Sequence, residues 1–323
     1  MKLHQFARPA MALITCSLAL NVWAASGDKP LRVIVPAPAG GTMDTAARVV
    51  GQQISADTGR PVIVENRPGA TGSIGLSAML QAAPDGNTIL LGASNLLVEA
   101  PQVMKVPYDP LKDIVTIARV ASSSYVLVTG ASYPAKDFQG LVAQLKTRKG
   151  KSSFASYGMG TVSQYSGLIL SSQADLDMQH VGYAGSPPAL QDLIGGQVDI
   201  MFDGVVTSLP LIKSGMLRPY AVSGKSRSRY FPDVPTMTEL GYRDIQFQGQ
   251  VCFYGSSKLP ADVLAKLQAL IKRAADAPAV QQKLIDVGVE PDVSIDTAAL
   301  LAENKLLSQR NAAIVKKFNI QAN

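Results

Sequence analysis

Residues 31–50 read LRVIVPAPAGGTMDTAARVV: a short apolar run, a glycine-rich turn and an amphipathic stretch, in that order. The β-branched run from Leu31 to Pro36 predicts a buried strand. Apolar residues then recur at helical spacing, and Gly59 is placed to end that helix. Either Thr42 or Asp44 has a side chain suited to cap the helix start. A strand, a tight turn and a helix in succession predict an α/β fold.

The same unit recurs along the chain, which predicts parallel strands covered by helices. Further strands are expected at 61–65, 88–92, 125–129, 152–156, 177–183, 198–202, 218–222 and 251–255, and further helices at 77–83, 138–149, from 163, and at 187–194, 261–274, 279–287 and 297–318. The pattern restarts near residue 125, and a late strand followed by helices completes the first unit. We therefore predict lobe 1 from 27–123 plus 251–323 and lobe 2 from 124–250, joined by two crossing strands.

The first residues are typical of an export signal. Lys2 and Arg8 precede a short apolar stretch, which ends in small residues at Ala24. This predicts a signal peptide over residues 1–24, cleaved after about Ala24, and a periplasmic protein. The apolar stretch is shorter than the roughly 20 residues that a membrane span needs. Cys16 raises the alternative of a lipid anchor, although Thr precedes it where Gly or Ala is usual.

The composition favours a folded protein with a mild attraction for anions. The hydrophobic fraction of 47% supports a large core. The formal charge is +6, and losing Lys2 and Arg8 with the signal peptide lowers it to +4. The basic residues are scattered apart from short groups such as those at 146–151 and 225–229, and neither of these forms a basic face with stacking aromatics. Nucleic acid is therefore not an expected partner, whereas an anionic ligand suits the charge.

Residues for catalysis or metal binding are few. After cleavage His180 and Cys252 are the only histidine and cysteine, too few for a zinc site or an internal disulfide. Cys252 lies in an alternating strand pattern, which predicts a buried and inert thiol. His180 also falls on a predicted strand, and no Gly-x-Ser-x-Gly elbow accompanies it. We expect no catalytic residue, no metal and no cofactor.

Two glycine-rich turns are the candidate binding elements. The turn at 36–44 brings backbone amides and a helix start together, so a carboxylate or phosphate can bind there without an arginine. A tight turn with Asp44 as a simple cap is an equal alternative. The turn at 156–164 again places backbone amides before a predicted helix, and it adds the hydroxyl groups of Ser156, Thr161 and Ser163. It partly matches a dinucleotide fingerprint, but the third glycine is missing, which argues against NAD. Asp203 stands at the end of a predicted strand. There it is either a residue of the binding cleft or a solvated strand end, and the sequence favours neither alternative.

Short stretches at fixed order and spacing make the chain resemble a known family over nearly its whole mature length. They are IVPAPAGGTMD (34–44), VENRPGA (64–70), PDGNT (84–88), YDP (108–110), YAGSPPAL (183–190), GGQVD (195–199) and PDVPTM (232–237). The chain resembles the substrate-binding receptors of tripartite tricarboxylate transporters, also called Bug receptors. The resemblance implies a type II periplasmic binding protein fold, with two lobes of mixed sheets joined by a two-strand hinge.

The resemblance also implies a function. A small organic carboxylate would be held in the cleft by backbone amides and bridging waters, and delivered to membrane permease subunits of a tripartite transporter. The protein would be a monomer and not an enzyme. The ligand-binding residues implied by position are Ala39, Gly40, Gly41, Thr42, Asp44, Ser94, Asn95, Ser156, Gly160, Thr161, Ser163, Ala184, Gly185 and Asp203.

Three departures from the family pattern leave the identity of the carboxylate open. The family often has Phe where Ala37 stands, a large aromatic where Gln250 stands, and His where Tyr165 stands. These changes would alter the shape of the binding pocket, and therefore the ligand, without changing the class of receptor. Two other functions are alternatives: an exported enzyme that acts on small organic acids with His180 as its base, and the ligand-binding component of a signalling system.

Overall fold

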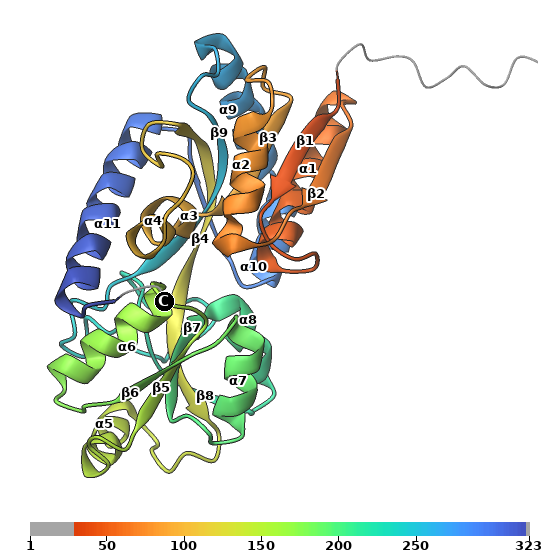
Figure 1. Ribbon diagram of the computed structural model, residues 1–323. Coiled ribbons are helices and arrows are strands. Elements are labelled where there is room, and N and C mark those ends of the chain that lie inside the picture. Colours follow the sequence, from red (N-terminus) through yellow and green to blue (C-terminus); the bar gives the residue numbers. More distant parts are fainter. Residues whose placement is uncertain (1–28, 321–323) are drawn as a thin grey trace, which may run out of the picture.

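The computed structural model describes residues 29–320. The expected signal peptide, its cleavage after Ala24 and Cys16 lie outside these residues. The described chain forms two lobes arranged one above the other along a single long strand (Figure 1).

Lobe 1 is built on a mixed sheet that begins with three parallel strands. Strand β1 (Leu31–Val35) lies between β2 (Val62–Asn66) and β3 (Thr88–Ala93). The sheet continues antiparallel with β9 (Gln248–Ser256), β4 (Ile114–Gly130) and β10 (Glu290–Ser294). Its helices are α1 (Thr42–Thr58), α2 (Ser73–Gln81), α3 (Asn95–Val98), α4 (Ala100–Val103), α9 (Ala261–Asp276) and α10 (Pro278–Asp286), with a 3-10 turn η1 (Ala70–Gly72) before α2.

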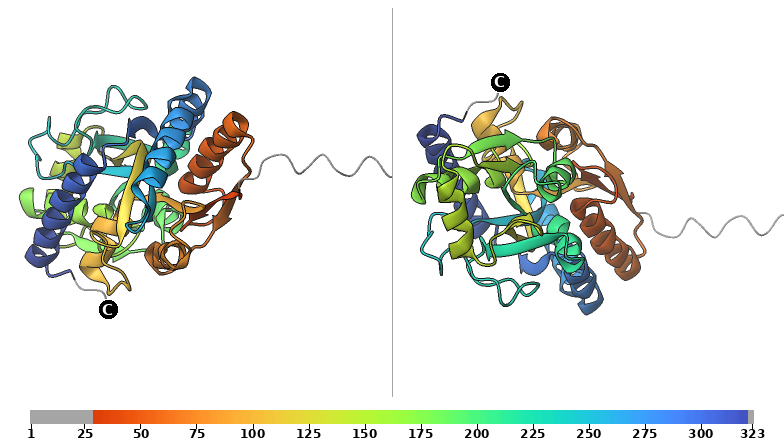
Figure 2. Two further views of the ribbon diagram at one scale, coloured as in Figure 1. Left: turned by 90° about the horizontal axis from the view of Figure 1, so that it is seen from above. Right: turned by 90° about the horizontal axis from the view of Figure 1, so that it is seen from below.

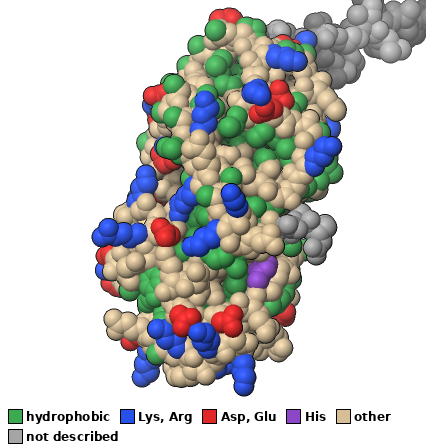
Figure 3. All heavy atoms as spheres, turned by 60° about the vertical axis from the view of Figure 1, so that its left-hand side comes forward, with side chains coloured by type: hydrophobic (Ala, Val, Ile, Leu, Met, Phe, Trp, Pro, Cys, Tyr) green, Lys and Arg blue, Asp and Glu red, His purple; other side chains and the backbone are tan. Residues whose placement is uncertain are grey.

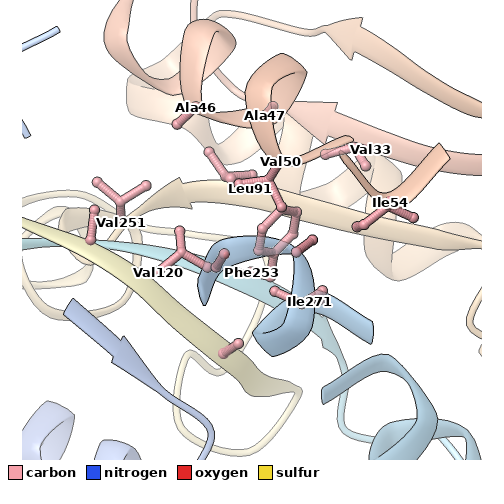
Figure 4. Close-up of a cluster of buried hydrophobic side chains, with 14 of the residues drawn as sticks. Val33, Ala46, Ala47, Val50, Ile54, Leu91, Val120, Val251, Phe253 and Ile271 are labelled. Atoms are coloured by element: carbon pink, nitrogen blue, oxygen red, sulfur yellow. The ribbon is translucent and has the colours of Figure 1, made fainter. Parts of the chain in front are cut away.

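Both faces of this sheet are buried, which explains the continuous apolar run of β1. Alternate side chains point to opposite faces of a strand. Val33 and Val35 therefore enter a core with residues of α1 and α9, in which Phe253 of β9 packs near Val50 and Ile271 (Figure 4). Ile34 enters a separate core with Leu76 and Met79 of α2.

Lobe 2 repeats the plan on a smaller scale. Strand β5 (Ser153–Ser156) pairs in parallel with β6 (Gln179–Gly182) and β7 (Ile200–Gly204), and β4 pairs antiparallel with both β7 and β8 (Leu217–Val222). Its helices are α5 (Phe138–Thr147), α6 (Val162–Gln173), α7 (Ser186–Ile194) and α8 (Val205–Lys213). The lobe has its own apolar core around Phe154, Tyr165, Leu170 and Phe202.

Strand β4 joins the two sheets. Ile114 to Ser124 pair with β9, and Tyr125 to Gly130 pair with β7 and β8. The chain crosses between the lobes along β4 and returns at β9, whose first residue, Gln248, pairs with Ser124. The predicted fold class, two lobes with mixed sheets joined by a two-strand hinge, is confirmed.

Helix α11 (Thr297–Lys317) contacts both lobes along one flank of the molecule, opposite α1 (Figure 2). In lobe 1, Glu303 accepts a hydrogen bond of 2.9 Å from Arg119. Further along the helix, Arg310 donates to the carbonyl oxygens of Asp244 and Gln246, each at 2.6 Å, and Ile314 packs in the lobe 2 core. The expected division placed all of 251–323 with lobe 1, whereas the end of α11 packs against lobe 2.

Several local expectations differ from the structure. Gly41, and neither Thr42 nor Asp44, is the N-cap of α1, and Asp44 instead accepts from the amide of Gly40, one residue before the cap. Gly59 ends the helix in a left-handed conformation as expected. Helix α2 begins at Ser73, four residues before the expected start, and α3, α4, α8 and β10 were not expected. Most of these elements are too short to show a hydrophobic period.

The surface carries mixed charge. Basic and acidic side chains are interspersed on the face drawn in Figure 3, without a continuous basic area. Between residues 29 and 320, no helix has both the length and the apolarity that crossing a bilayer requires.

Helix α6 packs closely against Phe154 of β5 at Gly167, and this contact predicts the effect of a substitution on stability. A Cβ added at Gly167 of α6 would lie 2.2 Å from Phe154 Cδ2, so we expect Gly167→Ala to destabilise the protein by about 1–3 kcal/mol through overpacking. Ser172→Ala, at an exposed position of the same helix, should change stability by less than about 0.5 kcal/mol. Urea unfolding measures both variants, and equal stability of the two would contradict this packing.

Candidate functional site

A cavity of about 280 Å³ lies where the two lobes meet. Its wall is mainly apolar and includes residues of α1, β3, β4, α7, α8 and β9. The lining residues are Thr42, Met43, Ala93, Ser123, Tyr125, Tyr157, Ser186, Gly204, Val206, Thr207, Gly249, Gln250, Val251 and Val289. No lysine or arginine is among them, so an anion in this cavity must be held by dipoles rather than by a cationic side chain.

The start of α1 supplies amides to this cavity. Gly40 has a φ of 79°, and its amide donates a 2.8 Å hydrogen bond to Asp44 Oδ2. The same carboxylate pairs with Arg48 at 2.9 Å, and hydrogen bonding to Arg48 lowers the pKa of Asp44. For the amides of Thr42 and Met43, no hydrogen-bond acceptor is found in the described chain, and both residues line the cavity. Asp44 therefore holds the turn, and the first two residues of α1 bring unbonded amides to the cavity wall.

The start of α6 repeats this turn in lobe 2. Gly160 has a φ of 69°, and its amide donates a 2.7 Å hydrogen bond to Gln164 Oε1, again four residues later. A Cβ at Gly160 would lie 2.4 Å from Val103 of α4, so lobe 1 packs directly on this turn. Glu99, between α3 and α4, accepts a 3.2 Å hydrogen bond from the amide of Val162. The start of α6 is thus covered by lobe 1, and none of its residues is among those that line the cavity.

The hydroxyl groups predicted for lobe 2 bond within the lobe. Ser163 donates to the carbonyl oxygen of Phe202 at 2.5 Å, and Thr161 donates to that of Gly158 at 2.7 Å. Ser156 is fully buried beneath the turn and contacts His180. These side chains fix the turn, and their protons point away from the cavity.

A directed chain of hydrogen bonds fixes the tautomer of His180. Because Gln164 Oε1 accepts from Gly160, the amide nitrogen of Gln164 faces His180 Nδ1 and donates to it at 3.2 Å. The proton of the imidazole is therefore on Nε2, which donates to Ser156 Oγ at 2.8 Å, and Ser156 in turn donates to Gly158. Burial lowers the pKa of His180. In this arrangement the imidazole has no free nitrogen to take a proton from Ser156.

Asp203 acts on the cavity through two hydroxyl groups. It is fully buried and accepts hydrogen bonds from Ser186 at 2.5 Å, Thr207 at 2.6 Å and Ser208 at 2.8 Å. Burial raises the pKa of Asp203, and the hydroxyl donors oppose that shift. Ser186 and Thr207 line the cavity, and their hydroxyl groups are engaged by Asp203, with the Gly204 carbonyl oxygen as a second acceptor 3.0 Å from Thr207 Oγ1.

Two tyrosines form an aromatic wall. The rings of Tyr125 and Tyr157 are stacked, with centroids 6.4 Å apart and planes at 17°. Burial raises the pKa of both side chains, so they stay neutral at physiological pH. Such a wall favours contact with the apolar part of a ligand.

Of the residues implied by the resemblance, only Thr42 is on the cavity wall. The others lie close to it. Ala39, Gly40, Gly41 and Asp44 form the α1 turn. Ser94 accepts a hydrogen bond from the amide of Gln250 and directly precedes Asn95, the first residue of α3, while Ala184 and Gly185 directly precede Ser186, the first residue of α7. The wall also has residues that sequence reasoning missed, although Tyr157 and Ser186 stand inside or beside quoted motifs. Others, such as Val206, Thr207 and Val289, carry no sequence signal.

The three departures from the family pattern lie in different places. Gln250 lines the cavity, Ala37 packs against the lobe 1 core, and Tyr165 is fully buried in the lobe 2 core. Only the first can contact a ligand in this arrangement.

Histidine, cysteine and carboxylate side chains are the candidates for metal binding and thiol chemistry in the described residues. Between residues 29 and 320 no group of three or more histidine, cysteine, aspartate or glutamate side chains is arranged to hold a metal ion. Cys252 is buried and unpaired, and burial raises the pKa of its thiol to about 12. The prediction that Cys252 is buried is confirmed, and a thiol with this pKa is not a nucleophile at neutral pH.

The strand order β2-β1-β3-β9-β4 in lobe 1, the two strands that join the lobes and the cavity between them are those of the type II periplasmic binding proteins. Residues 46–320 match the model of the tripartite tricarboxylate transporter family receptor. The chain is 36% identical to a UPF0065 protein of Bordetella bronchiseptica over 90% of this chain and 88% of that protein, and 32% identical to protein BugT of Bordetella pertussis over 90% and 89%. It belongs to this receptor family, which confirms the resemblance of the sequence.

Solved structures agree with this assignment. One described as a periplasmic transporter superposes with a TM-score of 0.81 at 34% identity, covering 92% of this chain and 99% of that chain. MatC of Rhodopseudomonas palustris, solved with bound malate, superposes with a TM-score of 0.76 at 29% identity, covering 88% and 98%.

The hydrogen-bond chain through His180 predicts its titration. Because burial favours the neutral ring, His180 should titrate below its ordinary pKa of 6.5. The stability that the neutral ring contributes is then fully present above pH 6.5 and is lost as the pH falls through the lowered pKa. Gln164→Glu places a carboxylate at Nδ1 and should raise the pKa by about one unit or more. Imidazole NMR shifts during a pH titration measure this value, and a wild-type pKa above 6.5 would contradict the arrangement.

Proposed function

We propose that this protein is an extracytoplasmic receptor that captures a small organic carboxylate between its lobes and delivers it to the membrane subunits of a tripartite transporter. The observation that carries the proposal is the pair of unbonded amides at the start of α1, which belong to two residues that line the interlobe cavity. Amides at a helix start bind anions through their N–H groups and the helix dipole.

The family supports the ligand class and the transporter. Its receptors serve tripartite tricarboxylate transporters by description, and the related MatC was solved with malate, a carboxylate. Membrane permease subunits are thus the proposed partners, and the periplasm is the proposed location. We propose that the receptor acts as a monomer.

We also propose that the protein is not an enzyme. An exported hydrolase or isomerase in this cleft needs a base within reach of a nucleophile. Ser156 and His180 are close enough, but His180 donates its Nε2 proton to Ser156, and Nδ1 is occupied by Gln164. Ser156 is also fully buried, so a substrate has no access to its hydroxyl.

The contacts between the lobes describe a closed arrangement. On one side Glu99 of lobe 1 bonds to Val162 of lobe 2. On the other side the Tyr230 hydroxyl of lobe 2 lies 2.9 and 3.1 Å from the carbonyl oxygens of Ile285 and Val289 in lobe 1, which share its one proton. A ligand that touches both walls stabilises this state over an open one, and so shifts the population toward closure.

Ligand binding tests the proposal. A panel of small carboxylic acids should include members that raise the melting temperature and give a titration by calorimetry, whereas their uncharged amides should not. The bound state gains stability because ligand binds only the folded protein. If no acid in a panel of aliphatic, aromatic and amino acids binds, the receptor proposal is wrong.

Variants of Asp44 test the α1 turn. Asp44→Ala removes the acceptor for Gly40 and should weaken acid binding about 5- to 30-fold, the effect of losing about 1–2 kcal/mol. Asp44→Asn keeps an oxygen acceptor and loses only the pair with the half-exposed Arg48, so it should bind within about threefold of wild type. Equal affinities of Asp44→Ala and wild type would show that the α1 turn does not hold the acid.

A further inference from the structure

We propose that Glu99 couples closure of the two lobes to the uptake of a proton, so that the closed arrangement gains population as the pH falls. Glu99 is not on the cavity wall, so it acts on a ligand only through the equilibrium between open and closed forms. This coupling goes beyond the receptor function proposed above, and it does not depend on which ligand the cavity holds.

Glu99 lies at the contact between the lobes. It belongs to lobe 1, where it directly precedes α4, and its carboxylate accepts a 3.2 Å hydrogen bond from the amide of Val162 in the first turn of α6. Val103, four residues later, is on the same side of α4 and packs on the turn at Gly160. Both ends of α4 therefore contact the start of α6 in lobe 2.

The carboxyl group of Glu99 is buried there without a cation. The residue is only 6% exposed, and the amide of Val162 is the one group of residues 29–320 that donates a hydrogen bond to its carboxylate. An ionised carboxyl group that is removed from water needs a cation or several donors to stay charged. Burial therefore raises the pKa of Glu99 to about 7, and the single amide only partly opposes this shift.

The other groups that face Glu99 keep their charge state near neutral pH. They are Tyr125 of β4, Tyr157 in the turn before α6, and Tyr165 of α6. Burial raises the pKa of all three tyrosines, and the charge of Glu99 adds to the rise, so they stay neutral. From lobe 1, α11 presents Asn311, which is uncharged and donates to a backbone carbonyl oxygen of α3. Among these groups only Glu99 changes its charge in this pH range.

Closure and protonation are linked because lobe 2 supplies part of the cover of Glu99. When the lobes separate, the start of α6 moves away, water reaches the carboxyl group, and its pKa returns toward the ordinary value of 4.5. The closed form has the higher pKa, so between these two values it binds a proton from solvent that the open form does not bind. The amide of Val162 then donates to the carbonyl oxygen of the neutral carboxyl group. The closed form is therefore favoured increasingly as the pH falls through 7, and the effect levels off below 4.5.

Small-angle X-ray scattering of the mature protein without a ligand tests the coupling. The radius of gyration should be smaller at about pH 5.5 than at about pH 8, because the ratio of closed to open molecules rises about 5- to 30-fold. Glu99→Gln mimics the neutral side chain and should lose this response. The matched control is Asp175→Asn, which removes an exposed carboxylate of lobe 2 and should respond as the wild type does.

Proton uptake during binding measures the same coupling in the closed form. Malate, adipate and benzoate are the probes, and calorimetry at about pH 7 in phosphate and in Tris separates proton uptake from binding, because the two buffers differ in ionisation enthalpy. Any probe that closes the lobes should bring about half a proton onto the wild-type protein and almost none onto Glu99→Gln.

A pH response in either measurement that Glu99→Gln abolishes supports the proposal. Its absence from both measurements overturns the proposal, and a response that persists in Glu99→Gln belongs to another group, such as His180, and overturns the role of Glu99. If no probe and no acid of the wider panel binds, the receptor function fails, whereas scattering still decides whether closure takes up a proton. Circular dichroism confirms folding of each variant, and Glu99→Ala replaces Glu99→Gln if the latter does not fold.

Discussion

The arrangement of the binding cleft depends on one interaction, made once in each lobe. A glycine in the left-handed conformation donates its amide to a side chain four residues later, from Gly40 to Asp44 and from Gly160 to Gln164. This bond closes the turn between a strand and a helix, so the helix begins at a fixed place relative to the sheet. The amides that follow the glycine are then left without an acceptor in the turn, and each lobe places such a helix start at the junction between the lobes.

The two helix starts nevertheless have different chemical surroundings. At α1 the unbonded amides belong to Thr42 and Met43, which line the cavity, whereas at α6 Glu99 and Val103 of lobe 1 cover the turn. Buried polar groups in lobe 2 also direct their protons inward, toward Asp203 and along the chain through His180. The start of α1 is therefore open to a ligand, whereas the start of α6 is already covered.

Contacts between the lobes are distributed around the cleft. Glu99 lies on one side, Tyr230 reaches Ile285 and Val289 on the other, and α11 anchors lobe 2 through Arg310. They combine single hydrogen bonds, which are exchanged for water at modest cost, with apolar packing of Ile314 and Val103 against the lobe 2 core. The strands β4 and β9 are the continuous connection, which fits opening and closing about the hinge with the cores of both lobes intact.

The sequence by itself determined the local units. The apolar run of β1, the glycine turn and the α1 pattern are contiguous, so propensity and spacing were enough to predict them, and the family motifs extended this to the fold and to Thr42. Tertiary structure alone decided which groups face the cavity and which are already bonded. Ser156, Ser163 and Gly160 looked like ligand donors, but their partners, His180, the Phe202 carbonyl and Gln164, are chosen by packing. Glu99 and Val162 are 63 residues apart, and no local pattern encodes their contact, because a hydrogen bond across lobes depends on where the whole chain places both ends.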